Sequence, residues 1–392
     1  MRKKDNSPFN KKNVIPFFTP WITNEDKKEV LKALGATMLT DGPNLRQFEI
    51  DFAKFTGAKY AIGVSNATTA LHLSLLSLQI GKNDEVIVPD MTFVATANAV
   101  VHAGAKPVLA DVDKQDMNIS IDSIEENITS RTKAIIPVHF AGNSCKMDKI
   151  KKIAQKYNIY IIEDCAHAIG ARYHGKHVGT FGDVGCFSFY PTKNITTIEG
   201  GMITTNSKQI ADFVTKARNH GISKTLSERY SIGKPWDYDI INSGYNYRLD
   251  EIRSALGISQ LKRIHKLNSL RKNACQYYNH KLKKVKGIIT PDLSDRGDNV
   301  FHLYIIKVQK AYGISRDELF NRLTKCGIST TVHYKPLHMF TVFKNICKET
   351  RTDNTSALYD EIISLPLFPQ ITKQEQDTVI KCIKENQKIK RG

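Results

Sequence analysis

The chain has 392 residues, 41% of them hydrophobic, which is enough for a large domain and a smaller one with substantial buried cores. It has no apolar run of about 18 residues or more, so no membrane span is expected. The formal net charge of +18, from 57 basic and 39 acidic residues, comes without a long basic run or a nucleic-acid-reading motif. This leaves open a lysine-rich solvated surface, a site for a small anionic substrate, or a nucleic-acid binder.

The seven cysteines are scattered, odd in number and without CxxC pairs. This pattern favours reduced thiols in a cytoplasm and argues against zinc, so no metal site is predicted. Residues 1–14 are basic and polar, and no apolar signal core follows them. We therefore expect a loose N-terminal tail on a cytoplasmic protein.

Two helices are expected first, and alternating strands and helices follow. Residues 24–36 have helical spacing with Asn24 as the expected N-cap, and residues 44–56 return to that spacing and end at Gly57. The alternation beyond them predicts an α/β fold with a large, mainly parallel sheet flanked by helices. Strands are expected at 60–65, 85–90, 106–112, 134–140 and 160–165, and helices at 67–78, 92–104, 120–129 and 146–157.

The second half of the chain predicts a bridge to a smaller domain. A long helical pattern at 249–285 is typical of a helix that joins two domains. We place a large α/β domain at 15–255 and a small C-terminal α+β domain at 256–392. The other elements expected are strands at 186–190, 200–206, 302–308 and 330–334, helices at 207–221, 316–327 and 373–387, and a looser segment at 222–247.

Lys193 lies in an uncharged loop between two predicted strands. An amine held in such a dry loop loses the solvation of its charged form, so its pKa falls and it can attack a carbonyl group. A single loop lysine is more often just exposed, so its neighbours must decide between the two interpretations. The dinucleotide fingerprint GxGxxG is absent, which disfavours a nicotinamide-binding domain.

Two further features lie at the carboxyl ends of predicted strands, which is where ligands bind in open α/β sheets. Residues 65–69 lead from a strand into a helix and can bind a phosphate or simply cap the helix. Asp164 ends another strand, three residues before His167, and can hold a protonated ring nitrogen or cap a loop. With Lys193, these groups suit pyridoxal phosphate (PLP), which needs an amine, a carboxylate and a phosphate cradle.

Seven segments are informative together: SNATTALHL, PDMTFVATANAV, EDCAHAIGARY, SFYPTKNITTIEGGMITTN, GYNYRLDEIRSALG, VHYKPLH and SLPLFP. In order and spacing they resemble the DegT/StrS family of nucleotide-sugar aminotransferases, from about Ile15 to Ile380. The resemblance implies a fold-type I, PLP-dependent transferase whose large domain has a seven-stranded sheet. It also implies a homodimer whose active sites are shared between the two subunits.

The resemblance implies roles for individual residues. Lys193 matches the lysine that binds the cofactor covalently, Asp164 the acid facing the pyridine nitrogen, and His167 a residue near the cofactor's 3-hydroxyl; these three are the predicted catalytic residues. The further cofactor contacts implied are Phe93 on the ring, Thr68, Thr69 and Ser188 on the phosphate, and Asn246 from the neighbouring subunit. The substrate contacts implied are Tyr247, Arg248, His333, Tyr334, Lys335 and His338.

The resemblance also implies the reaction, which is transfer of an amino group from L-glutamate to a nucleotide-linked keto sugar. The family's dehydrases carry histidine where this chain has Lys193, so transamination is predicted. The segments SNATTAL and VHYKP favour carbon 4 of a UDP-linked 4-keto-6-deoxy-N-acetylhexosamine. Two alternatives stay open: amination of a 3-keto sugar, and a non-catalytic PLP-binding regulatory protein.

Overall fold

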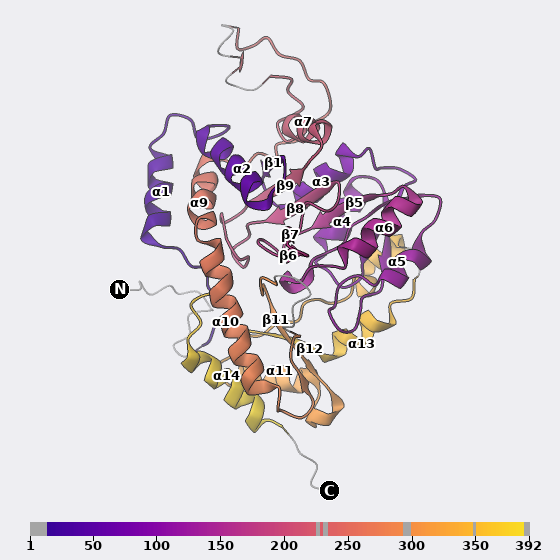
Figure 1. Cartoon of the computed structure of the whole chain (residues 1–392), viewed down its shortest axis with the longest axis vertical. Coiled ribbons are helices and arrows are strands. Elements are labelled where there is room, and N and C mark those ends of the chain that lie inside the picture. Colours follow the sequence, from indigo (N-terminus) through magenta and orange to yellow (C-terminus); the bar gives the residue numbers. More distant parts are fainter. Residues whose placement is uncertain (1–13, 225–227, 230–233, 293–298, 348–349, 388–392) are drawn as a thin grey trace.

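The computed structural model describes residues 14–224, 228–229, 234–292, 299–347 and 350–387. A seven-stranded sheet with helices on both faces forms the larger part, and a three-stranded sheet forms the core of the smaller part (Figure 1). This confirms the predicted α/β fold with a small α+β unit. Nearly all of the predicted tail, and residues 225–227 and 230–233 of the looser segment, lie outside the described residues.

The large sheet has the strand order β1-β9-β8-β5-β4-β2-β3. The strand β9 runs antiparallel to both neighbours, and the remaining pairs are parallel. The carboxyl ends of the parallel strands therefore meet at one edge, where such sheets bind ligands. The strands are β1 Tyr60–Val64, β2 Glu85–Pro89, β3 Lys106–Ala110, β4 Thr132–Ile135, β5 Tyr160–Asp164, β8 Val184–Ser188 and β9 Gly201–Thr205.

Successive residues of each strand pack against opposite helix layers, because strand side chains alternate between the two faces. Ile162 of β5 and Cys186 of β8 join the core with α3, α4 and α7. Their neighbours Ile161 and Phe187 face the other layer, with α5 and α6 beside Ile161 and α2 and α9 beside Phe187. The helices are α2 Pro43–Thr56, α3 Ala67–Ser77, α4 Ala95–His102, α5 Ile121–Asn127, α6 Met147–Tyr157, α7 Lys208–Ala217 and α9 Glu251–Leu261.

The first helix, α1 (Asn24–Leu34), is capped by Thr23, so the predicted N-cap at Asn24 is wrong by one residue. Thr23 and Asp26 form a capping box, in which each side chain accepts a hydrogen bond from the other residue's backbone. Asp26 is fully buried and also lies 2.6 Å from Arg263 Nη2. These contacts hold α1 against α9.

The predicted single helix at 249–285 is two helices. The first, α9, ends at Leu261, and α10 (Ile264–Leu282) begins after Arg263, which has the non-helical angles φ −108° and ψ 3°. The ion pair with Asp26 holds Arg263 at this break. The helix α10 then runs from the large sheet to the smaller unit (Figure 1).

The smaller unit packs three antiparallel strands, in the order β10-β11-β12, against three helices. The predicted strand at 330–334 is wrong, since only an isolated bridge joins Thr331 to Ser364 there. The elements are β10 Ile288–Ile289, β11 Tyr304–Val308, β12 Ile362–Leu365, α11 Arg316–Lys325 and α14 Lys373–Glu385. Short connecting elements are β6 Arg172–Tyr173, β7 Lys176–His177, α12 Thr341–Ile346, α13 Asp353–Glu361 and the 3₁₀ turns η1 Phe140–Gly142, η2 Lys310–Tyr312 and η3 Leu337–Met339.

Two of the cysteines are paired. Cys326, which follows α11, and Cys382 of α14 form a disulfide across 56 residues of sequence, so the prediction of reduced thiols is wrong for this pair. The packing of α11 against α14 brings the two residues together, which their spacing in the sequence does not reveal. The other five cysteines are free, and four of them are buried.

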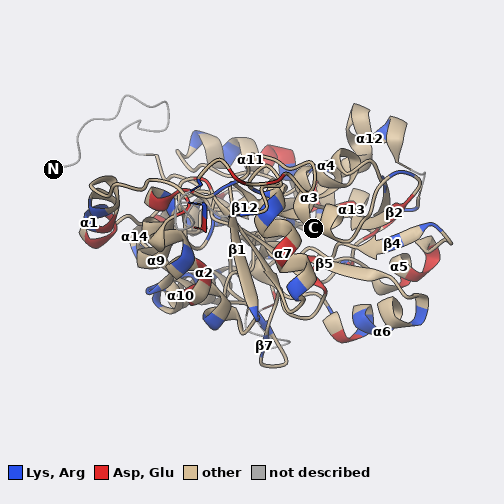
Figure 2. Cartoon of the chain, turned by 90° about the horizontal axis from the view of Figure 1, so that it is seen from above, with Lys and Arg blue, Asp and Glu red and all other residues tan. Residues whose placement is uncertain are grey.

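Charged side chains of both signs are distributed over the helices (Figure 2). Lys and Arg are interspersed with Asp and Glu on α6 and α11, which is typical of a solvated surface. None of the helices within the described ranges combines the length and apolar character needed to cross a membrane.

Candidate active site

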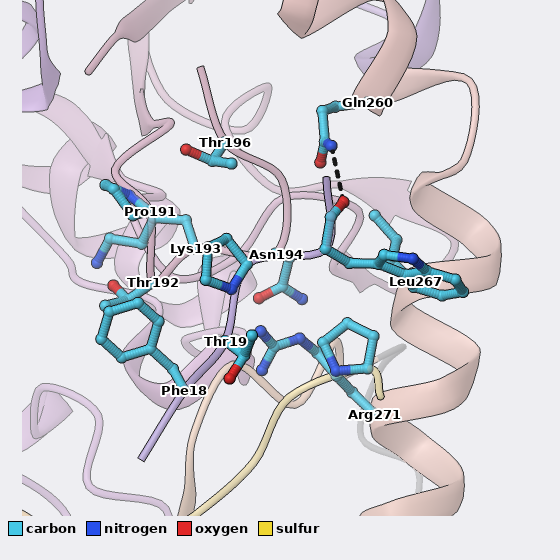
Figure 3. Close-up of a pocket in the computed structure, with 13 residues that line it drawn as sticks. Phe18, Thr19, Pro191, Thr192, Lys193, Asn194, Thr196, Gln260, Leu267 and Arg271 are labelled. Atoms are coloured by element: carbon cyan, nitrogen blue, oxygen red, sulfur yellow. Dashed lines mark hydrogen bonds between the residues drawn. The ribbon is translucent and has the colours of Figure 1, made fainter. Parts of the chain in front are cut away.

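Lys193 lies in the loop between β8 and β9, at the carboxyl edge of the large sheet. The next residue anchors this loop: the buried Asn194 amide donates to Asn268 Oδ1 (2.7 Å) and to the carbonyl of Val300 (2.9 Å). The side chains of Lys193 and Asn194 leave the loop in different directions beside a pocket that Phe18 also lines (Figure 3). The loop is therefore fixed without using the lysine side chain.

The amine of Lys193 is available for chemistry. Its side chain is half-buried, and within the described part of the chain its Nζ forms no hydrogen bond or ion pair. Burial lowers the pKa of Lys193 from 10.5 to about 8, and the nearby charge of Asp164 opposes that fall. A substantial fraction of this amine is therefore neutral near physiological pH, as a nucleophile or base requires.

Asp164 is the last residue of β5 and is buried. Its Oδ2 accepts a hydrogen bond from the Thr96 hydroxyl (2.9 Å), and its Oδ1 accepts one from the Ala166 backbone N–H (3.1 Å). Burial raises the pKa of Asp164, while these two hydrogen bonds and the charge of Lys193 oppose the rise. The carboxylate is thus held in one orientation in a dry site.

His167 presents an unpaired nitrogen in the same place. Its Nε2 lies 3.1 Å from the Tyr334 hydroxyl, whereas its Nδ1 is buried and has no hydrogen-bond partner among the residues that the structure describes. Its ring lies 4.4 Å from that of His302. Burial, and then the charge of Lys193, lowers the pKa of His167 well below its usual value, and the same causes lower the pKa of His333 to about 3. Lys193 therefore lies close enough to influence both rings.

The N-terminus of α3 forms one side of the site. The Asn66 side chain accepts from the Thr69 backbone N–H (2.9 Å), and the Thr69 hydroxyl donates back to the Asn66 carbonyl (2.8 Å). The Thr69 hydroxyl is therefore used in the helix cap. The Thr68 hydroxyl forms no hydrogen bond among the described residues, so it is available to a ligand. Gly201, paired with Ser188 on β8, lets this turn approach, since a Cβ there would lie 2.5 Å from Asn66 backbone atoms.

An aromatic side chain stands open at the same edge. Phe93 follows β2 and is 56% exposed, which is unusual for a phenylalanine. Its ring lies 6.0 Å from that of Tyr334, and Tyr334 lies 6.1 Å from the buried Phe140. The rings form a wall beside His167, with one exposed surface for a planar ligand.

Several of the remaining residues that were predicted to contact the substrate interact with other residues of this chain. Tyr247 stacks on Tyr245 at 4.7 Å, and Arg248 Nη1 donates to Asn219 Oδ1 (2.6 Å). Asn246 is exposed between them. Two more of the predicted contacts belong to the VHYKPLH segment: Lys335 lies over the Phe340 ring at 4.9 Å, and His338 pairs with Asp90 at 2.5 Å. Their roles in binding substrate or cofactor stay predictions.

Sequence reasoning missed three residues that support the site, namely Thr96, Asn194 and His302. One signal existed for Thr96: it lies four residues after Thr92, a helical spacing, and their hydroxyl oxygens are 2.9 Å apart. Asn194 and His302 contact each other at 3.3 Å across 108 residues of sequence, which no local pattern reveals.

A second polar cluster lies behind β5. His139, Glu163 and Cys165 offer atoms within 4.8 Å of one another, as a metal site would. However, the Cys145 N–H donates to His139 Nδ1, so His139 Nε2 carries the proton that it donates to Glu163 (3.0 Å). The Glu163 carboxylate also accepts three backbone N–H groups, from Gly179, Phe181 and Gly182. With these atoms engaged, the cluster is structural.

Residues 20–384 match the model of the DegT/DnrJ/EryC1/StrS aminotransferase family. The chain belongs to this family. The match spans both the large sheet and the smaller unit and includes Asp164, His167 and Lys193. It confirms the family resemblance inferred from the seven sequence segments.

Two named proteins are similar to this chain over almost their full length. The spore coat polysaccharide biosynthesis protein SpsC of Bacillus subtilis is 38% identical over 375 residues, covering 95% of this chain and 96% of that protein. The structure of PseC from Helicobacter pylori, described as an aminotransferase involved in the biosynthesis of pseudoaminic acid, has a TM-score of 0.89 and 30% identity, covering 95% of this chain and 99% of that one.

A third similar protein is known in two cofactor forms. The putative sugar aminotransferase Spr1654 of Streptococcus pneumoniae, in its PMP form, has a TM-score of 0.89 and 31% identity, covering 95% of this chain and 99% of that one. The PLP form of the same protein has a TM-score of 0.87. These likenesses confirm the predicted fold-type I architecture and the class of sugar aminotransferases.

Proposed function

We propose that this protein is a PLP-dependent aminotransferase that transfers the amino group of L-glutamate to a nucleotide-linked keto sugar. One observation carries the proposal: Lys193, Asp164 and the unpaired Nδ1 of His167 meet at the carboxyl edge of the large sheet. The PLP and PMP forms of Spr1654 support the cofactor.

The residues at this edge fit PLP chemically. The buried Asp164 carboxylate suits a protonated pyridine nitrogen, and the unpaired His167 Nδ1 suits a neighbouring hydroxyl. The N-terminus of α3, with Thr68 and Ser188, suits a phosphate. When bound, PLP supplies an electron sink and carries the amino group between the two substrates.

Lys193 has two roles in the proposed mechanism. Its Nζ would hold the cofactor covalently through the aldehyde carbon, and once released by the amino donor it would be free as a base. The lowered pKa of about 8 lets Nζ take the proton from the α-carbon of glutamate and, in the second half-reaction, return a proton to the sugar carbon that receives the amine. Asp164 would keep a proton on the pyridine nitrogen of a bound cofactor.

We infer carbon 4 of a UDP-linked 4-keto-6-deoxy-N-acetylhexosamine as the site of amination. The segments SNATTAL and VHYKP support this choice, as does the similarity to PseC, the pseudoaminic acid enzyme. The similarity to SpsC supports a place in polysaccharide synthesis. A cytoplasmic location stays a prediction.

We further propose a homodimer with shared active sites. Asn246, the residue predicted to reach the partner's cofactor phosphate, is exposed on the single chain. Just before it, the segment between α7 and α9 exposes Trp236 (74%), Ile240 (51%) and Ile241 (51%). Exposed apolar residues gathered in this way are typical of an interaction surface, and a second copy of the chain would cover them.

A screen of nucleotide-linked keto sugars with glutamate, read by mass spectrometry, tests the function. We expect an amino sugar from a UDP-linked 4-keto-6-deoxy substrate and little from 3-keto sugars or from dTDP- and GDP-linked analogues. Cofactor binding without turnover of any sugar would favour the non-catalytic regulatory alternative. Failure of the protein to bind PLP at all would contradict the proposal.

A further inference from the structure

Asp90 and His338 join the two parts of the chain beside the site. Asp90 follows β2 and is fully buried. Its Oδ1 accepts a hydrogen bond from the His338 backbone N–H (2.9 Å), and its Oδ2 accepts one from His338 Nδ1 (2.5 Å). Its carbonyl accepts a third, from the Leu337 N–H (2.9 Å). Three bonds thus tie the η3 turn to the end of a strand 248 residues away in sequence.

The tied segment carries a site residue. Tyr334 lies four residues before His338, and the rigid Pro336 lies between them. On its other side, His333 Nδ1 lies 2.8 Å from the Ser364 hydroxyl of β12. The segment is therefore anchored to the small sheet at one end and to the large sheet at the other. Between the two anchors, the Tyr334 hydroxyl meets His167 Nε2 at 3.1 Å.

We propose that Asp90 and His338 form a latch that positions Tyr334 against His167. They are positioning residues, since Asp90 acts on the site only through the segment that it holds. Loss of these hydrogen bonds would release the segment from the large sheet and let the Tyr334 ring move away from His167 and Phe93. The importance of Tyr334 for turnover rests on the proposed function, whereas the latch itself does not.

The charges around His338 favour its protonated form. The hydrogen bond to Asp90 is the main cause that raises the pKa of His338; Asp111 adds to the rise, and burial and the charge of Lys344 oppose it. The Thr352 hydroxyl also lies 3.3 Å from Nδ1, and Cys347, whose pKa is raised mainly by burial, lies nearby. The imidazole of His338 therefore keeps its proton up to a higher pH than a free histidine, and the ion pair weakens as pH rises through the raised pKa.

Asp111 provides a matched control. It directly follows β3, the strand beside β2. Its carboxylate also holds a distant segment, because it accepts hydrogen bonds from the backbone N–H groups of Asn354 and Thr355. Like Asp90 it is buried, and among the described residues no hydrogen bond joins it to the segment that holds Tyr334. Loss of Asp111 thus disturbs the contact between the two units but removes none of the three hydrogen bonds between Asp90 and the η3 turn.

Amide hydrogen exchange in Asp90→Asn and Asp111→Asn tests the latch without any substrate. We expect the protection factors of Leu337 and His338 to fall on the order of tenfold in Asp90→Asn, and those of Asn354 and Thr355 to fall in Asp111→Asn. In the wild type, the protection of Leu337 and His338 should decline as pH rises through the raised pKa of His338, because the imidazole then loses its proton. Unchanged protection of both amides in Asp90→Asn would overturn the proposal.

The rate at which tetranitromethane nitrates Tyr334, read by peptide mass spectrometry, tests the positioning. We expect faster nitration in Asp90→Asn and an unchanged rate in Asp111→Asn. In turnover, Asp90→Asn should reduce kcat in the wild type but have little further effect in Tyr334→Phe, since it acts through that side chain. Equal nitration in the two Asp variants, or losses in kcat that multiply, would contradict the positioning role. If no sugar is turned over, the proposed function fails while exchange and nitration still decide the latch.

Discussion

Thr96 of α4 donates a 2.9 Å hydrogen bond to Oδ2 of Asp164, although 68 residues separate them in the sequence. This bond opposes the rise that burial causes in the pKa of Asp164. Together with the hydrogen bond from the Ala166 N–H to Oδ1, it fixes the orientation of the carboxylate. The orientation of the acid therefore depends on Thr96, which was not among the predicted site residues.

Replacement of Thr96 by valine removes this donor while keeping the shape of the side chain. We expect kcat to fall on the order of ten- to a hundredfold, because a buried hydrogen bond to a charged group contributes about 1.5–3 kcal/mol. Thr92→Val is the control, since Thr92 contacts Thr96 but not Asp164. Steady-state kinetics on the three proteins checks this. Equal losses in the two variants would show that the Thr96 bond to Asp164 has no special role.

Asp164→Asn should still bind the cofactor but lose most activity, because a neutral amide cannot hold a ring nitrogen protonated. The expected loss of kcat is on the order of a hundredfold, or about 3 kcal/mol. Asp183 provides the control, because it accepts a hydrogen bond from Ile161 N–H at the opposite end of β5. An Asp164→Asn protein within a few-fold of wild type would reduce Asp164 to a loop-capping acid.

The reaction of the cofactor-free protein with PLP should depend on pH through Lys193. The pKa of this amine is lowered to about 8, so the attachment rate should rise as pH increases through that value. The charge of Asp164 raises the pKa of Lys193, so Asp164→Asn should move the midpoint to lower pH. Borohydride reduction at successive times, followed by peptide mapping, measures the rate. A midpoint near 10.5, the ordinary lysine value, or an upward shift in the variant would be inconsistent with this electrostatic account.

The mixing of two inactive variants tests the shared site. Lys193→Ala removes the nucleophile, and Asn246→Asp places a carboxylate beside the expected phosphate of the partner's cofactor. In a mixed dimer both changes fall in one site and leave the other intact. Random exchange should return about a quarter of wild-type activity, by the symmetry of a two-fold dimer. If verified mixed dimers stay inactive while each variant alone is inactive, Asn246 has no role across the interface.

Local patterns predicted the strands of the large sheet well. These strands are buried on both faces, so each has a short run of apolar residues, such as 160–165, that the sequence reveals. They failed where distant contacts decide the structure. The helix break at Arg263 goes with an ion pair to Asp26, and the Cys326–Cys382 disulfide depends on the packing of α11 against α14. The loss of the expected strand at 330–334 likewise follows from tertiary packing rather than from composition.

The residues of the candidate site also fall into those that the sequence predicted and those that it did not. Lys193 and Asp164 were predicted because strand ends and one lysine loop have recognisable sequence patterns, and the family resemblance added His167. The residues that hold them, Thr96 and Asn194 among them, contact partners too distant in sequence for any local pattern to indicate. His338 shows the same limit, because its pairing with Asp90 depends on how the small unit folds back onto the large sheet.

The most direct test of the central claim follows the amino nitrogen itself. The purified protein, supplied with PLP, ¹⁵N-labelled glutamate and a UDP-linked 4-keto-6-deoxy-N-acetylhexosamine, should form an amino sugar that carries the label, together with an equal amount of 2-oxoglutarate. Lys193→Ala should form neither over many turnovers. Labelled product at near wild-type rate from Lys193→Ala, or no labelled sugar from the wild type with any nucleotide-linked keto sugar, would contradict the account.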